Sequence, residues 1–286
     1  MWHVDNLNDA DALLAFLQRD RVYAAYAIGD LEPAHAAASA WFGAWQGKTL
    51  AALALVYSGL EPPVLFTLGA PAGLQAIMAH AGLPPTVTIA SRWEHLPALQ
   101  TRYAFAALSP MLRMSVEPLG FRPTMGAAPV QRLHLDAVPA LHALFAHGGE
   151  HAPDAFSPSQ VAEGVFYGIY AGAALAAAGG THLVARQVGV GAVGNIYTHP
   201  AYRRQGYATL ITSAVTASLL ADGLTVVLNV NERNAPALAV YTKLGYRVAC
   251  RFVEGMGRQV VEEQRSEIED QRSEIEDRES VTSEKE

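Results

Sequence analysis

The segment 198–209 constrains this chain most, because its residue types fit the end of a strand, a turn and the start of a helix. It reads THPAYRRQGYAT and lies between an apolar run, 191–198, and an alanine- and leucine-rich stretch that predicts a helix over 203–221. Gly206 allows the backbone to approach a bulky ligand closely. Arg203 and Arg204 add positive charge to the N-terminal end of the helix dipole. The segment therefore predicts a binding site for a diphosphate.

A second ordered pattern follows about twenty-five residues later. The run 224–230 is rich in β-branched residues and predicts a strand, and 231–234 predicts a capping turn. A short helix is expected over 235–244, ended by Gly245 and followed by Tyr246.

These two patterns together resemble the signatures of the GNAT superfamily of N-acyltransferases. Arg203-x-x-Gly206-x-Ala208 is similar to the acyl-CoA pyrophosphate loop, and Asn234, Tyr241 and Gly245-Tyr246 match the second signature in order and spacing. The resemblance covers residues 130–258. It implies an α/β (α+β) GNAT fold with a mixed, mostly antiparallel sheet flanked by helices, and acetyl-CoA as the acyl donor.

The predicted elements of the second part of the chain follow the GNAT order. They are a strand at 130–135, helices at 137–147 and from the Ser157 cap onward, a hairpin of 165–170 and 173–184, the strand 191–198, the helix 203–221, the strand 224–230, the helix 235–244 and a strand near 247–253. Residues 1–120 echo this order, with helices at 10–19, 22–27 and 71–81 and strands at 40–45, 49–56 and 64–68.

The echo suggests a duplicated fold. At the place of the diphosphate loop the first copy carries Gly69-Ala70-Pro71-Ala72-Gly73, with no arginine. We therefore expect a degenerate GNAT-like domain at 1–125, distantly similar to glycine N-acyltransferase-like proteins, and an acyl-CoA-binding domain at 126–260. The acidic segment 261–286 contains a seven-residue duplication with one apolar residue per heptad, which predicts disorder rather than a coiled coil.

Charge and cysteine content exclude several classes of function. The net charge of −7 comes from 261–286, which holds eleven acids and four bases, whereas 1–260 holds sixteen of each, so no basic stripe predicts a nucleic-acid partner. The single Cys250 allows no internal disulfide and has no spaced zinc ligands around it, so no metal is expected. Residues 1–5 do not resemble a secretion signal, and no apolar run is long enough for a membrane partner. A cytoplasmic protein is the expectation.

The resemblance also implies roles for individual residues. The strand before the loop is expected to splay from its neighbour at a bulge and to offer backbone groups to the pantetheine arm, with the Thr198 amide contacting the oxyanion. Tyr241 would protonate the departing thiolate. The residues expected to bind the cofactor are Ile196, Tyr197, Thr198, Arg203, Arg204, Gln205, Gly206, Tyr207, Ala208, Thr209 and Asn234.

The general base stays open at this stage, because the strand 191–196 carries no carboxylate. The candidates are Glu150, His151, His182 or a water held by Asn195, and an amine of low pKa could react without a base. Tyr241 could instead be a packing residue, and Asn234 only a helix cap. The sequence therefore predicts an acyl-CoA-dependent N-acyltransferase acting on a small amine or an amino-acid-like acceptor, with a non-catalytic acyl-CoA sensor as the alternative.

Overall fold

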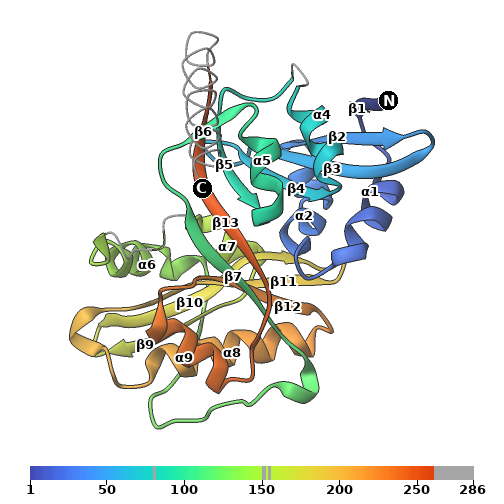
Figure 1. Cartoon of the computed structure of the whole chain (residues 1–286). Coiled ribbons are helices and arrows are strands. Elements are labelled where there is room, and N and C mark those ends of the chain that lie inside the picture. The colour runs from blue at the N-terminus through green and yellow to red at the C-terminus, as the bar shows by residue number, and fades with distance from the viewer. Residues whose placement is uncertain (80–81, 150–152, 154–155, 261–286) are drawn as a thin grey trace, which may run out of the picture.

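The structure, a computed structural model, describes residues 1–79, 82–149, 153 and 156–260 (Figure 1). The acidic segment 261–286 and its predicted disorder lie outside these residues. We call 1–125 the first half and 126–260 the second half. No helix in the described part of the chain is long and apolar enough to span a lipid bilayer.

The elements of the first half begin with a strand and a helix pair. In chain order they are β1 (Trp2–Asn6), α1 (Ala10–Leu17), α2 (Ala25–Gly29), α3 (Pro33–Ala36), β2 (Ser39–Gln46), β3 (Thr49–Tyr57), β4 (Val64–Gly69), α4 (Pro71–Met78), β5 (Thr86–Ser91), α5 (Leu96–Leu99), β6 (Tyr103–Phe105) and β7 (Ser109–Val116).

The second half follows a similar order with two fewer elements, one α-helix and one strand, among the described residues. It contains β8 (Gln131–Leu133), α6 (Val138–Phe145), α7 (Pro158–Glu163), β9 (Phe166–Ala171), β10 (Ala174–Ala185), β11 (Val190–Thr198), α8 (Tyr207–Ala221), β12 (Thr225–Asn231), α9 (Ala235–Lys243) and β13 (Arg247–Gln259). The repeat agrees with the predicted duplication, although β1, β5, β6 and β7 were not predicted as strands.

All strands join one mixed sheet in the order β1-β2-β3-β4-β5-β13-β7-β12-β11-β10-β9-β8, with β6 paired to β13. Only β4–β5 and β11–β12 are parallel among the described pairs, and the others are antiparallel. The predicted mixed, mostly antiparallel sheet flanked by helices is confirmed.

The two halves exchange strands at the centre of this sheet. Strand β7 of the first half lies between β12 and β13 of the second, and β13 continues upward to pair with β5 and β6 of the first. Figure 1 shows these two long strands crossing together from one half to the other. The proposed division at residue 125 follows the repeat of elements, but the hydrogen-bonded sheet runs across it.

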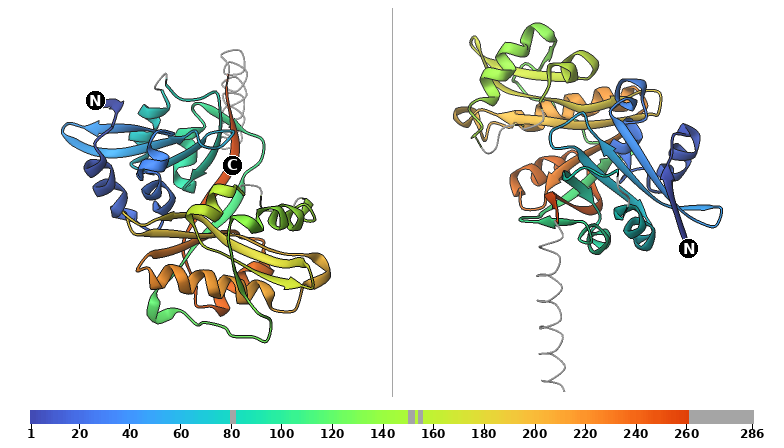
Figure 2. Two further views of the ribbon diagram at one scale, coloured as in Figure 1. Left: turned by 180° about the vertical axis from the view of Figure 1, so that it is seen from behind. Right: turned by 90° about the horizontal axis from the view of Figure 1, so that it is seen from above.

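Apolar side chains on the two faces of the second-half sheet pack against different partners. Val226 and Leu228 of β12 belong to a core with α8 and α9. Val227 of β12 and Phe252 of β13, on the opposite face, belong to a core with α1 and α2 of the first half. Both views in Figure 2 show the first-half helices beside this face. The sheet of the second half is therefore covered on one face by its own helices α8 and α9. On the opposite face it is covered in part by helices of the first half.

Candidate functional site

Strand β11 bends and separates from β12 where the sequence predicted a bulge. The pairing of β10 with β11 shifts register between Ala178 and Gly180, and Asn195 has a left-handed backbone conformation with φ 55°. The parallel pairing of β11 with β12 stops at Val193 opposite Leu228. Residues 194–198 of β11 therefore diverge from β12 and leave a wedge-shaped gap between two parallel strands.

Several buried polar atoms on the unpaired end of β11 and on the next residue of β12 have no hydrogen-bond partner among the described residues. They are Asn195 Oδ1, Tyr197 OH, Thr198 Oγ1 and Asn229 Oδ1. Leaving such an atom unsatisfied costs about 1–3 kcal/mol, so four of them on the unpaired ends of two neighbouring strands call for a partner. The amides and hydroxyl of a pantetheine arm are suitable partners, and the residues present fit such a group.

The loop after β11 differs in one respect from the prediction. The helix expected over 203–221 begins only at Tyr207, because Arg204 (φ 63°) and Gly206 (φ 79°) both adopt left-handed conformations that end any helix before them. Arg203 and Arg204 are therefore loop residues that precede α8. Gly206 becomes the N-cap of α8, and its cap carries no side-chain hydrogen bond.

The N-terminus of α8 has the geometry of an anion site. The first N–H groups of a helix have no partner within it, and here they belong to Tyr207, Ala208 and Thr209. A Cβ atom built on Gly206 would meet nothing within 4 Å, so open space lies directly above the cap. Together with the positive end of the helix dipole, this space can take a phosphate group.

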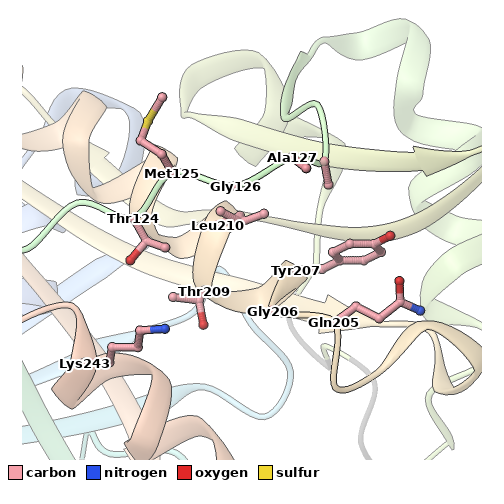
Figure 3. A pocket seen from close by; sticks show the side chains of 11 residues that line it. Thr124, Met125, Gly126, Ala127, Gln205, Gly206, Tyr207, Thr209, Leu210 and Lys243 are labelled. Atoms are coloured by element: carbon pink, nitrogen blue, oxygen red, sulfur yellow. The ribbon is translucent and has the colours of Figure 1, made fainter.

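A pocket of about 480 Å³ adjoins this cap (Figure 3). Its walls are the first turn of α8, the segment 124–128 and Lys243 at the end of α9. In Figure 3 the Lys243 side chain points to the side of the pocket where Thr209 lies. Lys243 is a cation that the sequence did not single out, because only the packing of α9 beside α8 brings it to this pocket.

The two arginines of the loop have different surroundings. Arg203 donates from Nε to the carbonyl oxygen of Thr198 at 3.2 Å, and its guanidinium lies 5.9 Å from the ring centre of Tyr197. Arg203 therefore ties the loop to the end of β11. Arg204 is exposed beside the cap.

Tyr241 on α9 is buried, with 9% of its surface exposed. Burial raises the pKa of its phenol to about 12, so the group stays protonated at neutral pH and can donate a proton. Asn234 caps α9, since its Oδ1 accepts a hydrogen bond from the Ala237 amide at 3.1 Å. The helix-cap role considered for Asn234 is thus present, and a contact with the pantetheine stays a prediction.

The base candidates fall into three groups. Glu150 and His151 lie outside the described residues. Asn195 donates from Nδ2 to Gln160 Oε1 at 2.9 Å, which fixes its side chain beside the bulge. His182 of β10 packs over Gly194, where an added Cβ would lie 2.3 Å from its Nε2, and its Nδ1 is 3.2 Å from the hydroxyl of Tyr26 in the first half.

The corresponding gap in the first half is closed by side chains. The pairing of β4 with β5 stops at Phe66 opposite Ala90. Just beyond it, Thr67 Oγ1 lies 2.6 Å from Ser91 Oγ and 3.0 Å from His95 Nδ1, and all three residues are buried. This hydrogen-bonded cluster satisfies its own polar atoms across the two strands, which supports the hypothesis that the first half keeps the packing of the fold without the clamp.

Comparisons with known proteins agree with this geometry. Residues 166–254 match the family model of FR47-like proteins. A Drosophila protein of known structure superposes with a TM-score of 0.67 at 13% identity, over 89% of this chain and 98% of its own. A putative GNAT acetyltransferase from Novosphingobium aromaticivorans gives 0.51 at 20% identity, over 68% of this chain and 84% of its own.

A tandem GNAT protein from the clavulanic acid biosynthesis pathway superposes with a TM-score of 0.52 at 14% identity, over 90% of this chain and 98% of its own. No protein of curated function matches the chain in sequence. Residues 166–254 thus match the FR47-like family model, and the chain shares its fold with solved GNAT acetyltransferases.

Proposed function

We propose that this chain is an acyl-CoA-dependent N-acyltransferase that transfers an acetyl group from acetyl-CoA to a small amine or an amino-acid-like acceptor. The observations that carry the proposal are the open N-terminus of α8 at Gly206 and the end of the β11–β12 pairing at Val193 opposite Leu228. The first turn of α8 offers backbone amides to a diphosphate. Strands β11 and β12 offer unsatisfied polar atoms to an extended pantetheine arm.

In this proposal the chain binds the donor along a single track. The amides of the first turn of α8 hold the diphosphate, and Arg204 and Lys243 add positive charge beside it. The pantetheine arm lies in the gap beside Ile196 and Thr198, and the Thr198 amide polarises the acyl oxygen. When bound, the thioester supplies an activated acyl carbon.

The proton transfers are assigned to two residues on either side of the gap. The amine nitrogen forms a bond with the acyl carbon while the carbon–sulfur bond breaks. Tyr241 donates its proton to the departing sulfur, because burial keeps the phenol protonated at neutral pH. His182 accepts the proton of the amine, since it is the ionisable side chain that packs over Gly194 at the start of the gap.

A non-catalytic acyl-CoA sensor is the second candidate, and one observation favours it. Strand β11 carries no carboxylate along residues 190–198, where a base would be well placed. The buried, protonated Tyr241 favours an enzyme, because a sensor has no use for an acid beside the sulfur. Release of free thiol from acetyl-CoA in the presence of a panel of amines separates the two: CoA binding without thiol release from any acceptor would favour the sensor.

The diphosphate site is tested by Gly206→Val. A β-branched side chain is strained at positive φ and would fill the space above the cap, so we expect CoA affinity to fall by about tenfold or more in a calorimetric titration. Gly172→Val is the matched control, because Gly172 has φ 63°, meets nothing within 4 Å and lies in the β9–β10 turn. Unchanged affinity in Gly206→Val would remove the basis of the proposal.

The proposed acceptor is a small molecule rather than a nucleic acid or a membrane, and the proposed compartment is the cytoplasm. These proposals rest on the balanced charge of residues 1–260 and on the lengths of the apolar runs in the sequence.

A further inference from the structure

A buried arginine in the centre of the sheet forms no direct ion pair with a carboxylate of the described residues. Arg113 of β7 is 2% exposed, and none of the ion pairs among the described residues includes it. Its Nε has no hydrogen-bond partner among those residues, and its Nη1 donates only a long hydrogen bond, 3.4 Å, to the carbonyl oxygen of Val22. An uncompensated buried charge costs several kcal/mol, which is why buried guanidinium groups are normally paired.

Two aromatic rings hold this guanidinium in place. Its central carbon lies 4.7 Å from the ring centre of Tyr26 and 5.3 Å from that of Phe252. Cation–π contacts of this kind orient the group and recover part of the desolvation energy. They leave its in-plane N–H donors, which match the two oxygens of a carboxylate, without a strong acceptor.

Arg113 lies next to the proposed transfer site. It is the cross-strand partner of Asn229, which directly follows the last β12 residue paired with β11. Tyr26, under the guanidinium, reaches His182 through its hydroxyl, and His182 packs over Gly194 at the bulge. A continuous chain of contacts thus connects Arg113 to the start of the gap.

Arg113 and Tyr26 lie on the face of the sheet opposite helices α8 and α9. Phe252, which contacts Arg113, belongs to the core formed with α1 and α2, whereas the residues that alternate with Asn229 on β12, Leu228 and Val230, pack with α8 and α9. On this face Tyr26 contacts both groups, since its ring lies under the Arg113 guanidinium and its hydroxyl lies 3.2 Å from His182 Nδ1. The first half supplies Tyr26 and Arg113, and the second supplies His182 and Asn229.

We propose that Arg113 binds the carboxylate of the acceptor, so that the acceptor is an amino acid or another amine that carries a carboxylate group. This inference rests on the acyltransferase function proposed above. The carboxylate accepts hydrogen bonds from the Arg113 guanidinium, and the amine lies nearer the bulge, where His182 takes up its proton as the nitrogen–carbon bond forms. The product keeps the carboxylate and gains an amide.

The test compares each of a set of amino acids with its own carboxamide as acceptor. The wild-type enzyme is expected to show kcat/KM at least about tenfold higher for the amino acid, because the carboxamide cannot form the charge-assisted bidentate contact with Arg113. Arg113→Gln is expected to bring that ratio close to one while leaving the affinity for CoA unchanged. Arg251→Gln, an exposed arginine on β13, serves as control and should keep the preference.

Several outcomes would overturn the inference. They are equal kcat/KM for amino acids and carboxamides in the wild-type enzyme, or a preference that survives in Arg113→Gln. If Arg113→Gln does not fold, the test uses the wild-type enzyme and Arg113→Lys, because lysine keeps the charge and loses the bidentate geometry of the guanidinium. An undiminished ratio of kcat/KM for amino acid over carboxamide in Arg113→Lys would also contradict the inference.

A binding measurement separates this inference from the proposed function. If no acceptor releases thiol, the melting temperature of the CoA-bound wild-type protein is measured with each amino acid and each carboxamide. Stabilisation by amino acids alone supports the Arg113 site, and its absence in a protein that binds CoA overturns the site while the cofactor proposal stands. Failure to bind CoA at millimolar concentration overturns the proposed function itself.

Discussion

Two neighbouring tyrosines show how the surroundings of a residue determine what it can do. Tyr241 and Tyr246 have ring centres 5.9 Å apart, both are buried, and burial raises the pKa of both phenols. Tyr246 places its hydroxyl 2.7 Å from Thr216 Oγ1 and so completes a buried hydrogen bond. The hydroxyl of Tyr241 has no such partner in the described part of the chain, and it remains available to a ligand.

Tyr241→Phe is therefore expected to lower kcat by about 10²-fold or more at neutral pH, because it removes the proposed proton donor and keeps the ring. The affinity for CoA, measured by calorimetry, should change little. Tyr246→Phe is the control: it loses the bond to Thr216 and is expected to lower unfolding free energy by about 1 kcal/mol with kcat retained. Equal kcat in wild type and Tyr241→Phe would assign Tyr241 to packing.

Asp30, at the end of α2, predicts a pH dependence of stability. Burial raises the pKa of its carboxyl to about 7, above the value near 4 expected in the unfolded chain. The folded state thus retains a proton that the unfolded state loses, so this group contributes most stability below about pH 4. That contribution is lost as the pH rises toward 7, and the ionised side chain destabilises the fold above it.

Asp30→Asn should then raise the free energy of unfolding by about 1–2 kcal/mol at pH 8, after allowance for its partial exposure, and by much less at about pH 5. Urea unfolding at the two pH values measures the difference. Asp136→Asn, at an exposed position, is the control and should show no such pH-dependent gain. A gain of equal size at both pH values would show that ionisation of Asp30 is not its cause.

At the scale of elements, α7 connects a helix cap to the proposed site. Ser157 Oγ accepts a hydrogen bond from the Ser159 amide, and Gln160 Oε1 accepts one from the Ser157 amide. The two bonds form a capping box. The same Gln160 oxygen accepts from Asn195 at the bulge of β11. The start of α7 and the bulge are thus held by one side chain.

Ser157→Ala is expected to reduce the free energy of unfolding by about 0.5–2 kcal/mol, the usual range for loss of an N-cap. Chemical denaturation measures this change. Ser157→Asp should restore most of it, because aspartate also caps helices. Stability unchanged in Ser157→Ala would show that the capping box contributes nothing to the fold.

The whole molecule is held together by the strand exchange. Strand β7 supplies the partner of both β12 and β13, and β13 supplies the partner of β5. Separation at residue 125 would leave long, apolar strand edges exposed in both fragments, and such edges aggregate. The repeated element order suggests two domains, but the pairing makes the halves dependent on each other.

Residues 126–260 expressed alone are therefore expected to be insoluble or to lack cooperative thermal unfolding in circular dichroism, and co-expression with 1–125 should restore a soluble complex. Removal of 261–286 is the control, and we expect it to leave both melting temperature and activity unchanged. Cooperative unfolding of isolated 126–260 at the temperature of the full chain would contradict the dependence of the halves.

Local signals in the sequence accounted for the elements that depend on neighbouring residues. The Ser157 cap, the Gly172 turn and the Gly206 loop follow from the backbone preferences of those residues and were predicted at or near their observed places. The start of α8 was predicted too early, because arginine and glutamine are good helix formers and nothing local reveals the left-handed turn at Arg204.

The sequence by itself determined the order of elements in the second half, the turn at Gly206 and the spacing that places Tyr241 after β12. Only the tertiary structure decided which strands pair across the halves and which side chains meet at the gap. Tyr26 and His182 are 156 residues apart, and β7 pairs with residues more than a hundred positions away. The physical reason is that local preferences fix backbone conformation over a few residues, whereas contacts between distant segments depend on how complete faces pack.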